Sequence, residues 1–253
     1  MRRKEREAAG LFLVEGPQAV REALLAGVVA EVYVDPASAD RLSELVDAAH
    51  AAGAGVRELG RREVAALTDT VTPQGVVAVC RQVDVPLEHA VRVGSRLVVC
   101  CAQVRDPGNA GTVVRCADAF GADGVVLSAG SVELTNPKTV RASVGSLFHL
   151  PVCVGAGLTA VVDAAHAAGL QVLAADGSGA DELTLLSRDG VLARPTLWLF
   201  GNEAWGLPEE DLALADRVVR VPLYGAAESL NLATAAAVCL YATATAQHLG
   251  SHS

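Results

Sequence analysis

The polar residues with the clearest chemical potential lie near the C-terminal end of the chain. An apolar segment is followed by a loop that carries Glu228, Ser229 and Asn231, and then by an Ala-rich segment, residues 232–248. Alanine is the strongest helix former, so this segment is expected to be a helix. Ser and Asn side chains are good helix N-caps, but one cap satisfies one helix end. Two interpretations are therefore open: both residues compete to cap the helix, or they contact a ligand.

A second apolar segment with a polar loop behind it lies upstream. Four apolar residues, 197–200, run directly into Gly201, Asn202 and Glu203. Such an uninterrupted run is typical of a buried parallel strand. In open α/β sheets, ligands bind just outside the carboxyl ends of the strands. The two Gly-containing loops therefore predict a ligand cradle that is built largely from backbone.

A third pair of polar residues, Asn109 and Arg115, follows the apolar run 97–104. Pro and Gly break regular structure, so residues 105–111 are expected to form a loop before a helix over 112–120. Taken alone, Asn109 is an ordinary turn residue, and Arg115 is a helix charge that reaches into solvent. Their place after a predicted strand end is what makes them candidates for ligand contact.

Together the three loops resemble a known family. The segments are Asp-Pro-Gly-Asn-Ala-Gly-Thr-Val-Val-Arg at 106–115, Leu-Phe-Gly-Asn-Glu-Ala-Trp-Gly-Leu at 199–207 and Val-Pro-Leu-Tyr-Gly-Ala-Ala-Glu-Ser-Leu-Asn-Leu-Ala at 221–233. They are similar to the three motifs of the SpoU (TrmH-like) RNA 2′-O-ribose methyltransferases, which belong to the SPOUT superfamily. Three motifs in the right order make a specific match, which a lone motif would not.

The resemblance implies a fold, a cofactor and a set of site residues. The implied fold is α/β: a C-terminal SPOUT domain with a parallel sheet and a deep trefoil knot, preceded by a small L30e-like α/β domain. The implied cofactor is S-adenosylmethionine. The residues implied to bind it are Gly201, Val221, Leu223 and Leu230. The residues implied to act in catalysis are Asn109, Arg115, Glu203, Ser229 and Asn231.

The family assigns Arg115 the role of base or of orienting group, and the first role conflicts with its chemistry. A ribose hydroxyl must lose its proton as it attacks the methyl group. An arginine side chain stays protonated in proteins and cannot readily accept that proton. We therefore expect Arg115 to bind phosphate and stabilise the nascent alkoxide, with a substrate phosphate taking the proton. The sequence leaves both roles open.

The chain is expected to divide into two domains. Residues 1–80 read as a small α/β unit that resembles the family's L30e-like RNA-binding domain, with Glu15-Gly16 matching a recurrent pair there. The alternative is a packing domain without ligand contact. Residues 81–95 are polar and lack periodicity, so they are expected to be a linker. The methyltransferase domain is then expected to span residues 96–253.

Composition narrows the class of protein further. The net charge of −9 argues against a protein that coats nucleic acid non-specifically. No apolar run reaches the length of a membrane span, and no signal-peptide core follows the charged start, so a cytoplasmic protein is expected. The Cys and His residues show no metal-ligand spacing, and no metal is expected because the sulfonium donor is already activated. The Ala-rich final helix is apolar around much of its circumference; burial within one subunit would explain part of this, and the resemblance to the family's dimers implies a homodimer for the rest.

The resemblance and the sequence also predict the reaction, the partners of two basic residues and the structure of one Gly-containing segment. The expected function is methyl transfer to a ribose 2′-hydroxyl of rRNA or tRNA, and the alternative is a non-catalytic RNA-binding module with the same fold. Lys138 and Arg141 are expected either to meet RNA phosphate or to be solvated. In the segment 171–182, an expected strand is followed by Gly177 and Gly179, but the third glycine of a dinucleotide fingerprint is missing, so the glycines are expected to form a turn.

Overall fold

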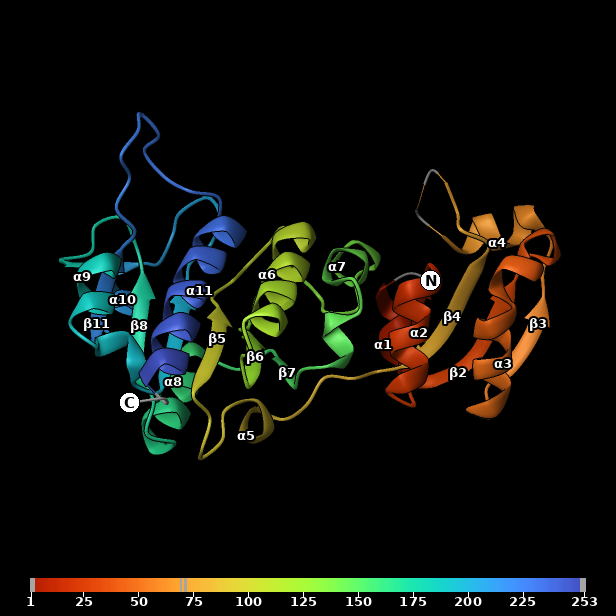
Figure 1. Ribbon diagram of the computed structural model, residues 1–253, viewed down its shortest axis with the longest axis horizontal. Helices are drawn as coiled ribbons and strands as arrows, with labels where there is room; N and C mark the ends of the chain where they lie inside the picture. Colours follow the sequence, from red (N-terminus) through yellow and green to blue (C-terminus); the bar gives the residue numbers. More distant parts are fainter. Residues whose placement is uncertain (1–2, 69, 71, 251–253) are drawn as a thin grey trace.

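The computed structural model describes residues 3–68, 70 and 72–250, and its described part contains two sheets arranged along the long axis (Figure 1). The smaller sheet has the strand order β1-β4-β2-β3, and only its β2–β3 pair is parallel. Its strands are β1 (Leu11–Glu15), β2 (Val29–Val34), β3 (Gly55–Glu58) and β4 (Val76–Arg81). The accompanying helices are α1 (Arg3–Ala9), α2 (Pro17–Leu25), α3 (Ser43–Ala51) and α4 (Arg61–Leu67).

The larger sheet has seven strands in the order β7-β6-β5-β10-β8-β11-β9, and every strand pair in it is parallel. Its strands are β5 (Leu97–Cys101), β6 (Gly124–Leu127), β7 (Val152–Val154), β8 (Gln171–Ala175), β9 (Asp181–Glu182), β10 (Thr196–Phe200) and β11 (Arg217–Arg220). Its helices are α5 (Leu87–Ala90), α6 (Pro107–Ala119), α7 (Pro137–Ser143), α8 (Leu158–Ala167), α9 (Leu183–Arg188), α10 (Glu209–Leu212) and α11 (Leu232–Gly250). The predicted parallel α/β fold is confirmed, while the trefoil knot stays a prediction.

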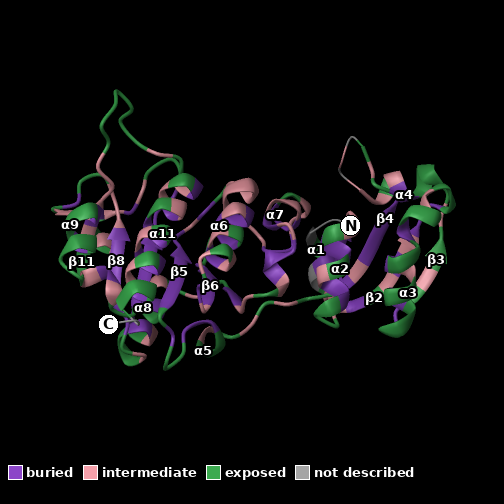
Figure 2. Cartoon of the chain, in the orientation of Figure 1, coloured by how far each residue is buried: buried purple, intermediate pink, exposed green. Residues whose placement is uncertain are grey.

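The central strands are buried on both faces, as their apolar sequences predict. Every residue of β5 and β10 is buried, and β5 is purple in Figure 2. Trp198 of β10 is completely buried, and its indole N–H donates a hydrogen bond of 2.9 Å to the hydroxyl of Thr243 on α11. The six cysteines are free thiols, and five of them are buried. Burial raises the pKa of Cys101 to about 12, which keeps this thiol protonated.

One element boundary differs from the sequence prediction. The helix expected over residues 112–120 begins at Pro107, so the supposed loop is largely the first turn of α6. Asp106 is its N-cap, and its carboxylate accepts a hydrogen bond of 2.8 Å from the backbone N–H of Asn109. Proline is favoured in the first turn because it has no N–H to leave unsatisfied. The Pro-Gly pair therefore opens the helix instead of preceding it.

The segment expected to be a linker has structure of its own. It contains α5, and Ala90 and Val91 are buried against the larger sheet. Asp84 forms a bridge with Val152 of β7. A Cβ at Gly124 would lie 2.1 Å from the carbonyl oxygen of Ala90, so the contact requires glycine there. Residues 84–91 thus pack on the larger sheet, and the domain boundaries stay a prediction.

The small sheet is joined to the larger unit by apolar packing and by charged pairs. Phe12 of β1 stacks on Phe148 with ring centroids 6.3 Å apart, within one continuous apolar core. His149 contacts Glu22 of α2 at 3.1 Å and Asp118 of α6 at 2.8 Å. Since these contacts connect both units, the small sheet has a fixed position beside α6 and α7.

Candidate active site

A cavity of about 490 Å³ opens at the carboxyl ends of β10, β8 and β11. These three strands are neighbours in the sheet, so the loops that follow them converge on one place. The loop 221–231 projects beyond the sheet, at the top left of Figure 1. Seven residues predicted from the sequence line the cavity: Gly201, Glu203, Val221, Leu223, Ser229, Leu230 and Asn231. The predicted residues Asn109 and Arg115 are absent from its lining.

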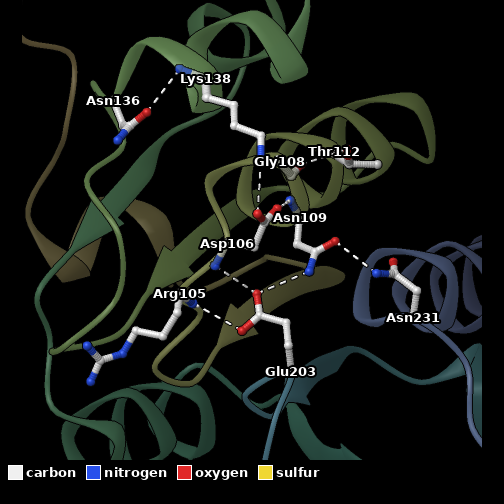
Figure 3. Close-up of polar contacts among 9 residues, drawn as sticks. All are labelled: Arg105, Asp106, Gly108, Asn109, Thr112, Asn136, Lys138, Glu203 and Asn231. Carbon is white, nitrogen blue, oxygen red and sulfur yellow. Dashed lines mark hydrogen bonds and ion pairs between the residues drawn. The ribbon is translucent and has the colours of Figure 1, made fainter.

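Glu203 connects the cavity to the start of α6. Its Oε1 accepts hydrogen bonds from the backbone N–H of Asp106 at 3.0 Å and from the side-chain amide of Asn109 at 3.1 Å. Its Oε2 accepts a bond of 3.1 Å from the backbone N–H of Arg105. Figure 3 shows these contacts meeting at one carboxylate. Glu203 thereby brings Asn109 to the cavity edge even though Asn109 does not line it.

The charge state of Glu203 follows from these bonds. Desolvation by burial acts to raise the pKa of its carboxyl group. The hydrogen bonds from its own backbone N–H, from Arg105, from Asn109 and from Asp106 outweigh that effect and lower the pKa. Glu203 is therefore a carboxylate near neutral pH, held by several donors.

Asn231 is the N-cap of α11, so Asn231 and Ser229 do not compete for the cap. Its Oδ1 accepts hydrogen bonds from the backbone N–H groups of Ala233 at 2.9 Å and Thr234 at 3.3 Å, so it caps α11. Its Nδ2 donates a bond of 3.1 Å to Oδ1 of Asn109. Ser229 does not cap the helix; it is exposed and lines the cavity. The serine hydroxyl is thus available to a ligand.

The basic residues of α7 pair with carboxylates. Lys138 lies 3.0 Å from Asp106, the cap of α6, and Arg141 pairs with Glu15 of β1. The bond from the Asn109 N–H and the bond from Lys138 lower the pKa of Asp106. The predicted phosphate contacts of Lys138 and Arg141 would therefore have to compete with these pairs.

Arg115 lies on the exposed side of α6, at the middle of the helix. Asn109, by contrast, is in the first turn. Among the described residues, no carboxylate forms an ion pair with the Arg115 guanidinium. The structure leaves this group accessible to an anion from outside.

Gly201 is required by the loop itself. A Cβ at this position would lie 2.3 Å from the backbone carbon of Gly206. The loop 201–207 closes on itself through two backbone hydrogen bonds of 2.9 Å between Asn202 and Gly206. The glycine therefore shapes the cavity wall before any ligand arrives.

Two residues of the site were not identified from the sequence. Asp106 orients the first turn of α6, and an Asp-Pro pair ahead of an apolar helical pattern was the signal for it. Asp176 lines the cavity directly after β8. Its position at a strand end was the available signal. Gly179, from the same segment, packs against β11, where its Cβ would lie 2.7 Å from the N of Arg220.

The same residues are matched by models of known families. A model described as the SpoU rRNA Methylase family matches residues 96–241, which is more than half of the chain. The chain belongs to the SpoU methylase family. A second model, described as RNA 2′-O ribose methyltransferase substrate binding, matches residues 13–86 of this SpoU methylase. The predicted family membership is confirmed.

Relatives of this SpoU methylase cover nearly its whole length. It is 36% identical over 243 residues to the 23S rRNA (guanosine(2553)-2′-O)-methyltransferase RlmP of Bacillus subtilis, covering 94% of this chain and 90% of that protein. The AdoMet-bound rRNA methyltransferase of Sinorhizobium meliloti has a TM-score of 0.82 at 32% identity, covering 96% and 90% of the two chains. The SpoU methyltransferase AviRb of Streptomyces viridochromogenes in complex with AdoMet has a TM-score of 0.85 at 29% identity, covering 98% and 95%.

The cavity of this SpoU methylase fits S-adenosylmethionine, the cofactor that the family uses. Its lining includes the carboxylates of Asp176, Glu203 and Glu228 and no Lys or Arg. This suits a ligand that carries a sulfonium and an ammonium group. Apolar walls from Val221, Leu223 and other residues suit an adenine ring. Within the described residues, no cluster of His, Cys, Asp and Glu could hold a metal ion, and no helix could cross a membrane.

Proposed function

We propose that the chain transfers a methyl group from S-adenosylmethionine to a ribose 2′-hydroxyl of rRNA or tRNA. The observation that carries the proposal is the hydrogen-bonded chain Glu203–Asn109–Asn231 at the rim of a cavity suited to this cofactor. The names of relatives such as RlmP favour rRNA. We also propose a cytoplasmic location, which is consistent with bacterial relatives such as RlmP.

Each residue at the rim has a proposed task. When bound, S-adenosylmethionine supplies a methyl group that its sulfonium has already activated. Asn109 and Asn231 hold the ribose hydroxyl in line with that group, since amides in a fixed network cost no reorganisation when the reaction occurs. Glu203 anchors this network, and its existing bonds make it a poor candidate for the base. Ser229 binds ribose or cofactor with its exposed hydroxyl.

Arg115 is proposed to bind an RNA phosphate and to steady the developing alkoxide. Its guanidinium is exposed and forms no ion pair among the described residues, which suits an incoming anion. Arginine binds phosphate through two parallel N–H groups. The phosphate so held takes the proton of the hydroxyl, a step that an arginine cannot perform.

A homodimer through α11 is also proposed. Val238 and Tyr241 are 38% and 61% exposed, and they line an apolar groove with Leu183 of α9. An apolar helix face of this kind is typical of an interface between protein chains. Light scattering at micromolar concentration is expected to give the mass of two chains, and Val238→Glu is expected to give one. A monomeric wild-type protein would contradict the proposal.

Methyl transfer itself is the test of the proposed function. The purified protein, with labelled S-adenosylmethionine, is offered rRNA and tRNA from cells that lack the gene, followed by mapping of 2′-O-methylated nucleotides. Labelling of a specific nucleotide is expected. Cofactor binding without labelling of any RNA would favour the alternative, a non-catalytic RNA-binding module. The relatives named as methyltransferases support the enzyme over that alternative.

A further inference from the structure

The two tryptophans of the chain have opposite environments. Trp198 is completely buried, whereas Trp205 is 53% exposed. An indole ring stabilises a fold mainly through burial, and about half of the Trp205 side chain lacks that burial. The proposed catalytic network does not use Trp205. The exposed indole lies two residues from Glu203 in the sequence and is therefore a candidate for contact with a ligand.

The loop that carries Trp205 is braced. Asn202 and Gly206 bond each other through their backbones at 2.9 Å, on either side of the tryptophan. The Asn202 side chain donates a bond of 2.7 Å to the carbonyl of Gln103 and accepts one of 2.8 Å from the N–H of Ala204. These bonds fix the backbone from which the ring projects. A ring on a fixed backbone loses little entropy when a ligand binds it.

The surroundings of Trp205 favour a nucleotide over a protein partner. Its chain neighbours Ala204 and Gly206 line the cavity proposed for the cofactor, so the indole is attached to the wall of the proposed site. Two residues before it, Glu203 holds the amide of Asn109 and the backbone N–H of Arg105. Arg105 is exposed, and its side chain points away from that cluster in Figure 3. An exposed aromatic ring and an exposed cation, on the two loops that Glu203 connects, are the kinds of group with which proteins bind single-stranded RNA.

We propose that Trp205 stacks on an unpaired base of the RNA substrate next to the methylated ribose, with Arg105 binding an adjoining phosphate. The inference rests on the proposed function and adds to it a requirement on the RNA. A base within a duplex is covered by its neighbours, so stacking on the indole requires an unstacked nucleotide. The substrate is therefore a loop, bulge or otherwise open segment.

Fluorescence tests the contact directly, because Trp205 is the exposed indole of a protein whose other indole is buried. A single-stranded oligoribonucleotide of mixed sequence is expected to quench the emission, and the same sequence annealed to its complement is expected to quench it far less. The quenching is expected to vanish in Trp205→Phe. Emission that stays constant with single-stranded RNA bound would overturn the inference. So would emission that changes with protein concentration alone, because the indole would then face a second copy of the chain.

Kinetics supply the second readout, with a matched pair of variants. Trp205→Leu keeps an apolar side chain but loses the flat ring, and it is expected to raise KM for RNA by about 5-fold to 100-fold, the range of one base stack. Trp205→Phe keeps a ring and is expected to restore most of the loss. S-adenosylmethionine affinity is expected to be unchanged in both variants.

Equal KM values for Trp205→Leu and the wild type would refute stacking while leaving the methyltransferase activity intact. A wild type without activity would refute the proposed function, and the fluorescence experiment would still decide on the stack.

Discussion

Asn231 donates a hydrogen bond of 3.1 Å to Asn109, although the two residues are 122 positions apart. The same Asn231 caps α11, and Asn109 lies in the first turn of α6. The contact therefore ties together the starts of two helices, one from each side of the site. Both amides have fixed orientations as a result, because each has a further partner.

Breaking this contact is expected to reduce methyl transfer more than cofactor affinity. Asn109→Ala removes an amide that bonds both Glu203 and Asn231. We expect single-turnover methylation to slow by about 10²-fold to 10³-fold, as for the loss of one preorganised donor. Asn109→Asp is expected to be at least as slow, because it places a second carboxylate against Glu203. Near wild-type turnover in both variants would remove Asn109 from the reaction.

Arg115 gives a separate test of the phosphate-binding role. Arg115→Lys keeps a cation and loses the planar fork, while Arg115→Ala loses both. We expect turnover to fall by about 10²-fold to 10³-fold, slightly less for Lys, with nearly unchanged affinity for S-adenosylmethionine because Arg115 does not line the cavity. Single-turnover methylation with parallel calorimetry measures both quantities. An active Arg115→Ala enzyme would contradict the role.

The two cavity loops are expected to differ in their tolerance of a methyl group. Gly201→Ala would place a Cβ 2.3 Å from the backbone of Gly206, whereas a Cβ at Gly225 meets nothing within 4 Å. We expect Gly201→Ala to lower the free energy of unfolding by about 1–3 kcal/mol, the usual cost of overpacking, and Gly225→Ala to leave it almost unchanged. Chemical denaturation of the two variants is the measurement. Equal stabilities would show that the loop 201–207 can relax.

A pH dependence is expected from His149. Its hydrogen bond to Asp118 raises the pKa of the ring, desolvation opposes this, and the bond to Glu22 raises it further. A raised folded-state pKa adds stability below the unfolded value, near 6.5, and this contribution is lost as the pH rises through the folded pKa. The free-energy difference between wild type and His149→Gln is therefore expected to be largest in mild acid and to shrink in alkali. Glu22→Gln is expected to weaken the same trend, and a difference that does not change with pH would argue against it.

The sequence predicted the larger sheet well because its strands are continuous apolar runs. Strands β5 and β10 are buried throughout, and periodicity detects such segments reliably. It predicted the start of α6 poorly, because Pro and Gly at residues 107 and 108 are breakers in most contexts. The hydrogen bond from the Asn109 N–H to the Asp106 side chain and the bond from the Ala110 N–H to the Asp106 carbonyl show that they open a helix.

The sequence predicted which residues belong to the candidate site better than it predicted which residues contact each other. Motif resemblance selected Asn109, Glu203 and Asn231, and the structure joins these three by hydrogen bonds. It could not predict that Lys138 pairs with Asp106. Such pairs depend on how α6 and α7 pack, which is a tertiary property that local sequence does not encode.

The shared core around Phe12 and Phe148 is expected to couple the unfolding of the two units. Apolar residues of the small sheet and of the larger sheet belong to one continuous cluster. Unfolding of either half would expose apolar residues that pack against it in the other half. We therefore expect the two halves to unfold together. Calorimetry should then record one cooperative heat-absorption peak for the whole chain, and a protease should find no early cut that releases the first eighty or so residues intact.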